Sequence, residues 1–243
     1  MIPKESQPDF ARLLKKIDLS LPLLGLYDAP DPKGFEPLLR PKRGDCVFSF
    51  YKNWLAGQTL HITKEHYGCG GAGRWLCGIE MRSKKEFIKF LVGEEGLKAS
   101  PELMEKWIDS SRPYKAAHAH ILIGPLKESQ WEYIKSVTFF VNPDQLSTLL
   151  VGAQYHSSPQ DPPPVIAPFG SGCMGLLPFE NLNIPQASIG ATDIAMRRHL
   201  PANILAFTVT RLMFKQLCSL DESSFLYKQF LKDLKKARSL PGL

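Results

Sequence analysis

The chain has 243 residues, which suits one large domain or a domain with an appendage. Hydrophobic residues make up 44% and charged residues 22%, as in ordinary globular proteins, so disordered and fibrous classes are excluded. The apolar runs are only long enough for strands, which excludes a membrane span. The first ten residues carry acids and prolines instead of the basic and apolar pattern of a signal peptide.

The charge balance favours no nucleic-acid partner. The formal net charge is +6, but the basic residues are spread along the chain, and the short clusters at 42–43, 84–85 and 235–236 lie beside acids, as on solvated faces. The five cysteines are an odd number without a secretory signal. We therefore expect free thiols and a cytoplasmic location, and we leave a homo-oligomer open.

The first third of the chain contains strand and helix patterns in alternation. Residues 21–27 read as a strand, and the turn-forming residues 28–34 read as a loop. Residues 46–57 predict a buried helix ended by Gly57, although their aromatic content keeps a strand open as an alternative. A short strand is expected at 59–63, ahead of a glycine-rich stretch at 68–73.

Four segments carry capping chemistry that predicts the start of a helix. They are Ser83 with Glu86, Ser100 with Pro101, Asn142 with Pro143, and Ser223 or Ser224 at the head of an amphipathic helix over 221–238. Strand-like runs lie between them at 117–123, 136–141, 186–190 and 203–209.

The irregular order of these elements predicts a single α+β domain. We expect a mixed or largely antiparallel sheet of about five strands, flanked by helices. The proline-rich segment 157–168 reads as an extended loop inside this domain. The domain is assigned to residues 1–220, and residues 221–243 form a C-terminal amphipathic helix and tail.

The densest chemical signal surrounds Cys69. Its neighbours Gly68, Gly70, Gly71 and Ala72 let the backbone approach a ligand, and their amides, with a helix starting near Gly71, favour a thiolate or an anion. Glycine at positions 70 and 71 is expected to supply positive φ or close backbone approach. His66, three residues earlier, is a candidate base or metal ligand.

A second glycine-rich segment contains Cys173. Gly170, Gly172 and Gly175 match G-x-G-x-x-G, as Gly68, Gly70 and Gly73 do, but neither match opens a dinucleotide-binding βαβ unit. Both segments set a cysteine among small residues. The ligand-binding candidates are Gly68, Gly70, Gly71, Ala72, Gly170 and Gly172.

Other chemical groups are weaker candidates. Cys77 and Cys218 lie in apolar surroundings typical of packing residues. His118 and His120 would share one strand face with metal-ligand spacing, but no third ligand is evident, so their role stays open. The acids at 94–95, 102 and 105 read as solvated.

Several segments resemble the Domain of Unknown Function 169 family. They are Cys46 before a helix, T-K-E-H-Y-G-C-G-G-A, the strand ending in G-P-L, V-N-P-D-Q-L with G-A-Q-Y, and Cys173 after the proline-rich loop. The resemblance runs from roughly residue 8 to residue 215. It implies a compact α+β prokaryotic protein with cysteines at these three positions, and it implies no settled activity. The run 117–120 and the tail after about residue 220 depart from the family.

These observations predict that Cys46, Cys69 and Cys173 meet in one pocket. The leading hypothesis is a metal or cofactor protein in which the three thiolates hold an iron–sulfur cluster, or zinc completed by His66. One alternative is a module that holds a small anionic ligand on loops 68–73 and 170–175. Another is a thiol-based enzyme with Cys69 as its nucleophile. Whether the protein is an enzyme is left open.

Overall fold

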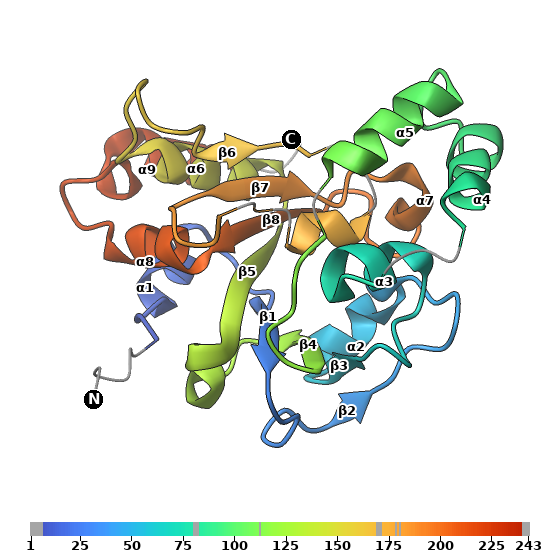
Figure 1. Ribbon diagram of the computed structural model, residues 1–243. Helices are drawn as coiled ribbons and strands as arrows, with labels where there is room; N and C mark the ends of the chain where they lie inside the picture. The colour runs from blue at the N-terminus through green and yellow to red at the C-terminus, as the bar shows by residue number, and fades with distance from the viewer. Residues whose placement is uncertain are drawn as a thin grey trace.

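A mixed sheet forms the centre of the protein (Figure 1). The computed structural model describes residues 7–79, 83–111, 113–168, 172–177, 179 and 181–239. Over these residues the eight strands follow the order β2-β3-β4-β1-β5-β8-β7-β6. They are β1 (Leu24–Ala29), β2 (Leu38–Leu39), β3 (Thr59–Ile62), β4 (His120–Pro125), β5 (Ile134–Val141), β6 (Val165–Ile166), β7 (Ala187–Gly190) and β8 (Leu205–Thr210).

The strand directions confirm the α+β class with a mixed sheet. The two edge pairs, β2 with β3 and β6 with β7, are parallel, and the other neighbours are antiparallel. The expected number of about five strands is too low. The edge strands β2 and β6 are two residues long, which is too short to produce an alternating pattern in the sequence.

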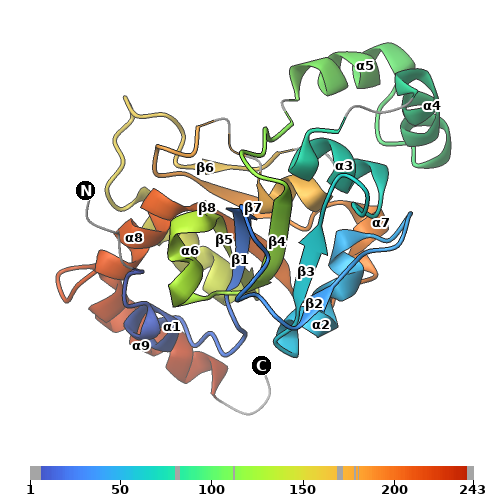
Figure 2. The same cartoon turned by 60° about the horizontal axis from the view of Figure 1, so that its bottom comes forward.

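Helices cover both faces of the sheet (Figures 1 and 2). One face carries α1 (Ala11–Lys16), α6 (Pro143–Gln154), α8 (Arg211–Ser219) and α9 (Gln229–Arg238). The other carries α2 (Tyr51–Leu55), α3 (Gly70–Cys77), α7 (Ile194–Arg197) and the 3-10 turns η1 (Val47–Phe50) and η4 (Gly172–Leu176). Further 3-10 turns are η3 (Glu128–Tyr133) and η5 (Phe225–Tyr227).

Each face has its own hydrophobic core. Successive side chains of a strand point to opposite faces, so Phe139 of β5 enters the core under α8 while Phe140 enters the core under α2. Phe139 packs with Phe207 and Phe214, and Phe140 lies against Tyr51 and Trp54. The cysteines of interest belong to the second core.

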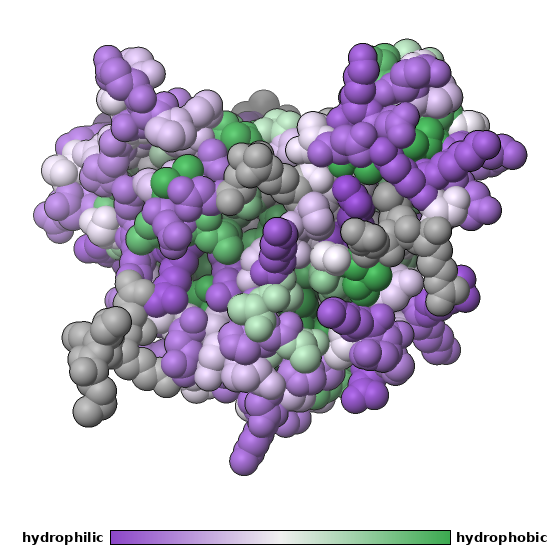
Figure 3. Space-filling model, viewed as in Figure 1, coloured by the Kyte–Doolittle hydropathy of each residue, from purple (hydrophilic) through white to green (hydrophobic). Residues whose placement is uncertain are grey.

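A small helical lobe projects from the second face (Figures 1 and 2). It consists of α4 (Lys84–Lys89), the π-helical turn η2 (Phe90–Glu94) and α5 (Pro101–Ser110). Ser83 and Ser100 cap α4 and α5, as predicted. The lobe has a separate core of Ile88, Leu91, Met104 and Ile108. Its outer surface is largely hydrophilic (Figure 3).

Some predicted boundaries are wrong for local reasons. The helix expected over 46–57 is η1 followed by α2, and Gly57 follows it with φ +84°. The helix expected over 221–238 begins at Gln229, after η5. The strand expected from residue 117 begins at His120, because the amides of Ala117 and His118 donate to the Asp28 carboxylate instead of to a strand.

The C-terminal segment is joined to the main core. Leu231 of α9 is buried in the core under α8. Ion pairs join Arg238 to Asp144 and Lys235 to Asp18, at 2.7 and 2.8 Å. The segment 157–168 includes β6, which pairs with β7. None of the helices in the described part of the chain has the length and apolarity to cross a membrane.

Candidate functional site

Cys69 is the N-cap residue of α3. Its backbone is extended (φ −83°, ψ 166°), and the nearby amides of Gly71 and Ala72 favour the thiolate form of its sulfur. A hydrogen bond with the Cys173 thiol is the largest influence on Cys69, and together with the amides it outweighs burial and lowers the Cys69 pKa to about 6.

Cys173 reaches Cys69 because η4 packs directly on β7. A Cβ on Gly175 would lie 2.9 Å from the Cα of Gly190, so only glycine permits this approach. The hydroxyls of Ser136 and Thr208 donate to backbone carbonyls of η4 and hold it on the sheet. The Cys173 side chain is 2% exposed. The buried sulfur therefore lies behind the partly exposed Cys69.

Cys46 lies at the N-cap of η1, close to the Cys69 loop. The Gly68 backbone has φ +78°, and a Cβ there would lie 2.6 Å from the Asp45 carbonyl oxygen. The amide of Gly44 donates to the Gly68 carbonyl at 3.0 Å, which ties the two loops together. Burial, with a smaller contribution from Cys69, raises the pKa of Cys46 to about 11. Cys46 is therefore a neutral thiol beside the Cys69 thiolate.

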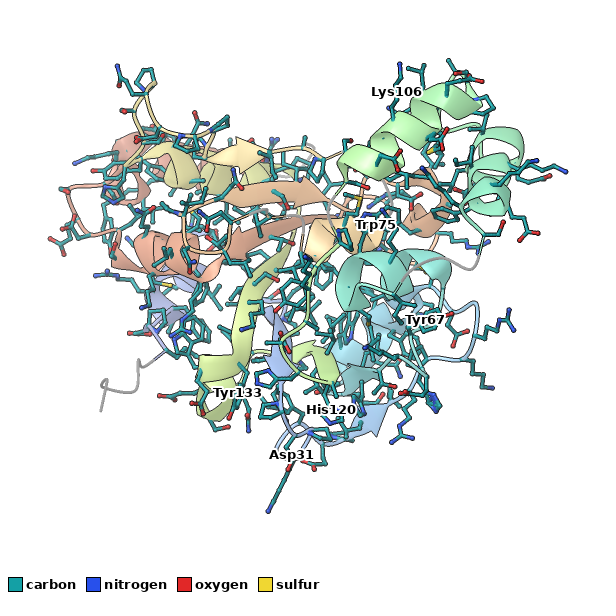
Figure 4. The ribbon with its side chains drawn as sticks, viewed as in Figure 1. Asp31, Tyr67, Trp75, Lys106, His120 and Tyr133 are labelled. Atoms are coloured by element: carbon teal, nitrogen blue, oxygen red, sulfur yellow. The ribbon has the colours of Figure 1, made fainter. Side chains whose placement is uncertain are left out.

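The three cysteines line one cavity of about 300 Å³. Aromatic side chains from α3 and the lobe form its opposite wall, and the Trp75 ring centroid is 5.4 Å from that of Trp107. Figure 4 shows Trp75 at the junction of α3 and the lobe. The other apolar lining residues are Phe87, Phe90, Leu91, Leu97, Ala195 and Met196.

Charged groups complete the lining. Asp193 caps α7 and accepts the amides of Ala195 and Gly172, at 2.9 and 3.0 Å. Glu95 also lines the cavity, and burial together with the charge of Asp193 raises its pKa. The expectation that Glu95 is an ordinary solvated acid is therefore wrong. Arg198 and His199 lie at the same cavity.

The remaining sequence candidates differ in where they lie relative to these sulfurs, and Gly70 and Gly71 line the cavity beside Cys69. His66 is exposed and is not among the described residues that line the cavity. Gly70 and Gly71 lie in α3 without positive φ, and a Cβ on Gly70 would meet no atom nearer than Phe87 at 3.9 Å. The expectation of positive φ is wrong for both, and the constrained glycine is Gly68. Gly170 lies outside the described residues.

The two strand histidines have different partners. His118 precedes β4, and its Nδ1 lies 3.2 Å from Asp28 Oδ1. The Nδ1 of His120 lies 3.0 Å from Nε2 of His61, whose pKa is lowered to about 4 by burial. His120 lies at the lower end of the molecule, away from the Trp75 cavity (Figure 4). Over the part of the chain that the structure describes, no three His, Cys, Asp or Glu side chains are grouped to hold a metal.

Sequence reasoning missed the aromatic wall and the acids. Trp107 and Phe87 read only as the apolar faces of short helices, and Asp193 carries no motif. The capped helices at 83 and 100 were the signal in the sequence, and they mark two short helices but do not say where these pack.

Comparison with known proteins gives a family and no activity. The profile of the domain of unknown function 169 family, described as uncharacterised ArCR, matches residues 24–219. This match covers most of the chain and confirms the resemblance that the sequence motifs indicate. No curated protein and no solved structure matches significantly.

Proposed function

The chain belongs to the domain of unknown function 169 family, whose description states no activity, and we propose that it binds a small molecule in the cavity and reacts with it through Cys69. The observation that carries this proposal is a thiolate held at a helix N-terminus on the wall of an apolar cavity. A cysteine with a pKa of about 6 is largely ionised at neutral pH, which is the nucleophilic form.

The cavity supports an organic ligand with a flat apolar part. A volume of about 300 Å³ lies at the lower end of the usual range for small-molecule sites. The rings of Trp75, Trp107 and Phe87 would contact such a ligand by stacking and edge contacts. The ligand would then be held with one end against Cys69.

An anionic ligand on the glycine-rich loops has less support. The amides of Gly71 and Ala72 already donate to the Cys69 sulfur. The amide of Gly172 already donates to Asp193. Fewer backbone donors therefore remain for a bound anion.

The test compares the alkylation of Cys69 by iodoacetamide and by N-phenyl iodoacetamide, with each rate divided by that of a free thiol. We expect the phenyl reagent to be favoured at Cys69 and its rate to saturate. Phe90→Ala removes part of the wall and should reduce this preference. Phe230→Ala is the matched control, because Phe230 is also an exposed phenylalanine but lies on α9, away from the cavity. Equal relative rates for both reagents would contradict ligand binding.

A second candidate is a soft metal ion that Cys46, Cys69 and Cys173 would move together to bind, since in the described part of the chain they are not already grouped as ligands. It is favoured by one observation, that all three sulfur-bearing side chains line the same cavity. Binding would require the neutral Cys46 to lose its proton, which a metal ion can drive. Anaerobic purification with metal analysis and a visible spectrum, followed by reconstitution with zinc or with iron and sulfide, tests it. A colourless protein that retains neither metal removes this candidate.

A further inference from the structure

We propose that Cys69 and Cys173 form an attacking and resolving pair that reduces a small disulfide bound in the cavity. This inference rests on the proposed function, because it requires a ligand in the cavity and a reactive Cys69. It adds a second reacting group and a substrate class. The first observation is that both cysteines line the same cavity, where α3 packs against η4, with a hydrogen bond between their side chains.

The two cysteines differ in the way that such a pair requires. Cys69 is partly exposed on the cavity wall at the N-terminus of α3, so it can meet a ligand there. Cys173 is 2% exposed, so Cys69 is the more accessible of the two sulfurs to an incoming molecule. Cys46 lines the same cavity, but it stands at a 3-10 turn and not at the N-terminus of an α-helix, which favours attack by Cys69.

The reaction balances without any other group. The Cys69 thiolate attacks one sulfur of the ligand R–S–S–R′, which forms Cys69–S–S–R and breaks the ligand S–S bond. The departing R′S⁻ takes a proton from solvent. Cys173 then attacks the Cys69 sulfur, its proton passes to the departing RS⁻, and a Cys69–Cys173 disulfide remains. Two electrons pass from the protein thiols to the ligand, and exchange with two external thiols, which leave as their disulfide, restores both protein thiols.

The lining indicates which disulfides fit. The aromatic wall favours flat apolar substituents, and the lining carries charges of both signs, with Asp193 and Glu95 as well as Arg198, so it favours no net charge on the ligand. We therefore infer a neutral, low-molecular-weight disulfide with aromatic or similarly flat substituents. A protein disulfide is excluded by size, because the cavity admits about 300 Å³.

The test uses 2,2′-dithiodipyridine, a neutral aromatic disulfide, with the full chain. In the wild-type protein we expect rapid release of two pyridine-2-thiones per chain and a Cys69–Cys173 disulfide in the peptide map. Cys173→Ser, which keeps a hydroxyl donor beside Cys69, should release one thione rapidly and retain the other as a mixed disulfide on Cys69. Cys218→Ser is the control and should behave as the wild-type protein does, because Cys218 is buried in the core on the other face of the sheet.

The outcomes separate the two proposals. If Cys69 of the wild-type protein reacts rapidly but keeps the mixed disulfide, the pair is wrong and the proposed function stands. If Cys69 reacts no faster than Cys218 in the wild-type protein, both are wrong. Should Cys173→Ser fail to fold, the wild-type peptide map still decides, because a disulfide of Cys69 with Cys46 in place of Cys173 overturns the pair.

Discussion

Removing the Cys173 thiol should make Cys69 a weaker acid. In Cys173→Ala the thiolate loses the hydrogen bond that most lowers its pKa. A hydrogen bond to a charged group contributes about 1.5–3 kcal/mol. Since one pKa unit corresponds to about 1.4 kcal/mol, the pKa of Cys69 should rise by about 1–2 units. The pH at which alkylation reaches half its maximal rate should rise by the same amount, from about 6 in the wild-type protein.

The wild-type rates can be estimated from the same pKa values. At pH 7 a thiol with a pKa of about 6 is about nine-tenths ionised, whereas Cys218, with a pKa raised to about 12 by burial, is ionised in about one molecule in 10⁵. Thiolates of lower pKa are individually less nucleophilic, with a Brønsted slope of about 0.4–0.5, which removes between two and three powers of ten. Ionisation alone should therefore make Cys69 about 100-fold faster than Cys218.

The assay is pulsed iodoacetamide labelling of native protein at several pH values, with each cysteine quantified by peptide mass spectrometry. Cys77 serves as an internal reference, because burial raises its pKa to about 12. Equal rates at Cys69 and Cys218, or a Cys69 profile that does not move in Cys173→Ala, would refute the hydrogen-bonded thiolate. The pKa of Cys69 in the folded protein lies below the pKa of a thiol in the unfolded chain. This difference stabilises the folded protein when the pH is above the unfolded-state pKa, and the stabilisation should be lost as the pH falls through about 6.

Three further substitutions test the supporting structure. Gly68→Ala should lower stability by about 1–3 kcal/mol more than Gly57→Ala in urea unfolding, because both positions have positive φ but only Gly68 is crowded, and only Gly68→Ala should slow Cys69 labelling. Ser100→Ala removes the cap of α5 and should cost about 1 kcal/mol, seen as faster amide hydrogen exchange confined to the lobe; exchange that changes across the whole sheet would contradict a local cap. Asp28→Asn places a side-chain NH2 group against the Tyr114 hydroxyl and the Ala117 amide, which now donate to the carboxylate, and should lower the unfolding free energy by roughly 1–3 kcal/mol. An unchanged urea midpoint would show that the carboxylate is not needed.

The sequence predicts the local elements well where local chemistry decides them. The caps at Ser83, Ser100 and Asn142 are present in the structure, and the helix at Cys69 begins where the glycines indicate. Prediction from the sequence fails where a residue distant in the chain takes the hydrogen bonds of a segment. The start of β4 moves to His120 because the Asp28 carboxylate, remote in the sequence, captures the preceding amides.

The sequence allowed the cysteines of the candidate site to be predicted, but not the residues that surround them. Small residues beside Cys69 and Cys173 mark backbones that can approach closely, and the Gly175–Gly190 contact is such an approach. Which segment packs against each glycine depends on the order of the strands in the sheet, and a local sequence pattern does not encode that order. Glu95 and Trp107 were missed for the same reason, because their place in the cavity depends on how the lobe packs against α3.

The separate core of the lobe divides the site into two independently adjustable parts. The sulfurs stand on elements that are fixed to the sheet, whereas much of the aromatic wall belongs to a helical unit with its own packed interior. Substitutions inside that unit can reshape the wall without disturbing the thiols. A library confined to the exposed cavity-facing residues of the lobe, such as Phe90, is therefore a route to altered ligand preference that leaves the reactivity of Cys69 in place.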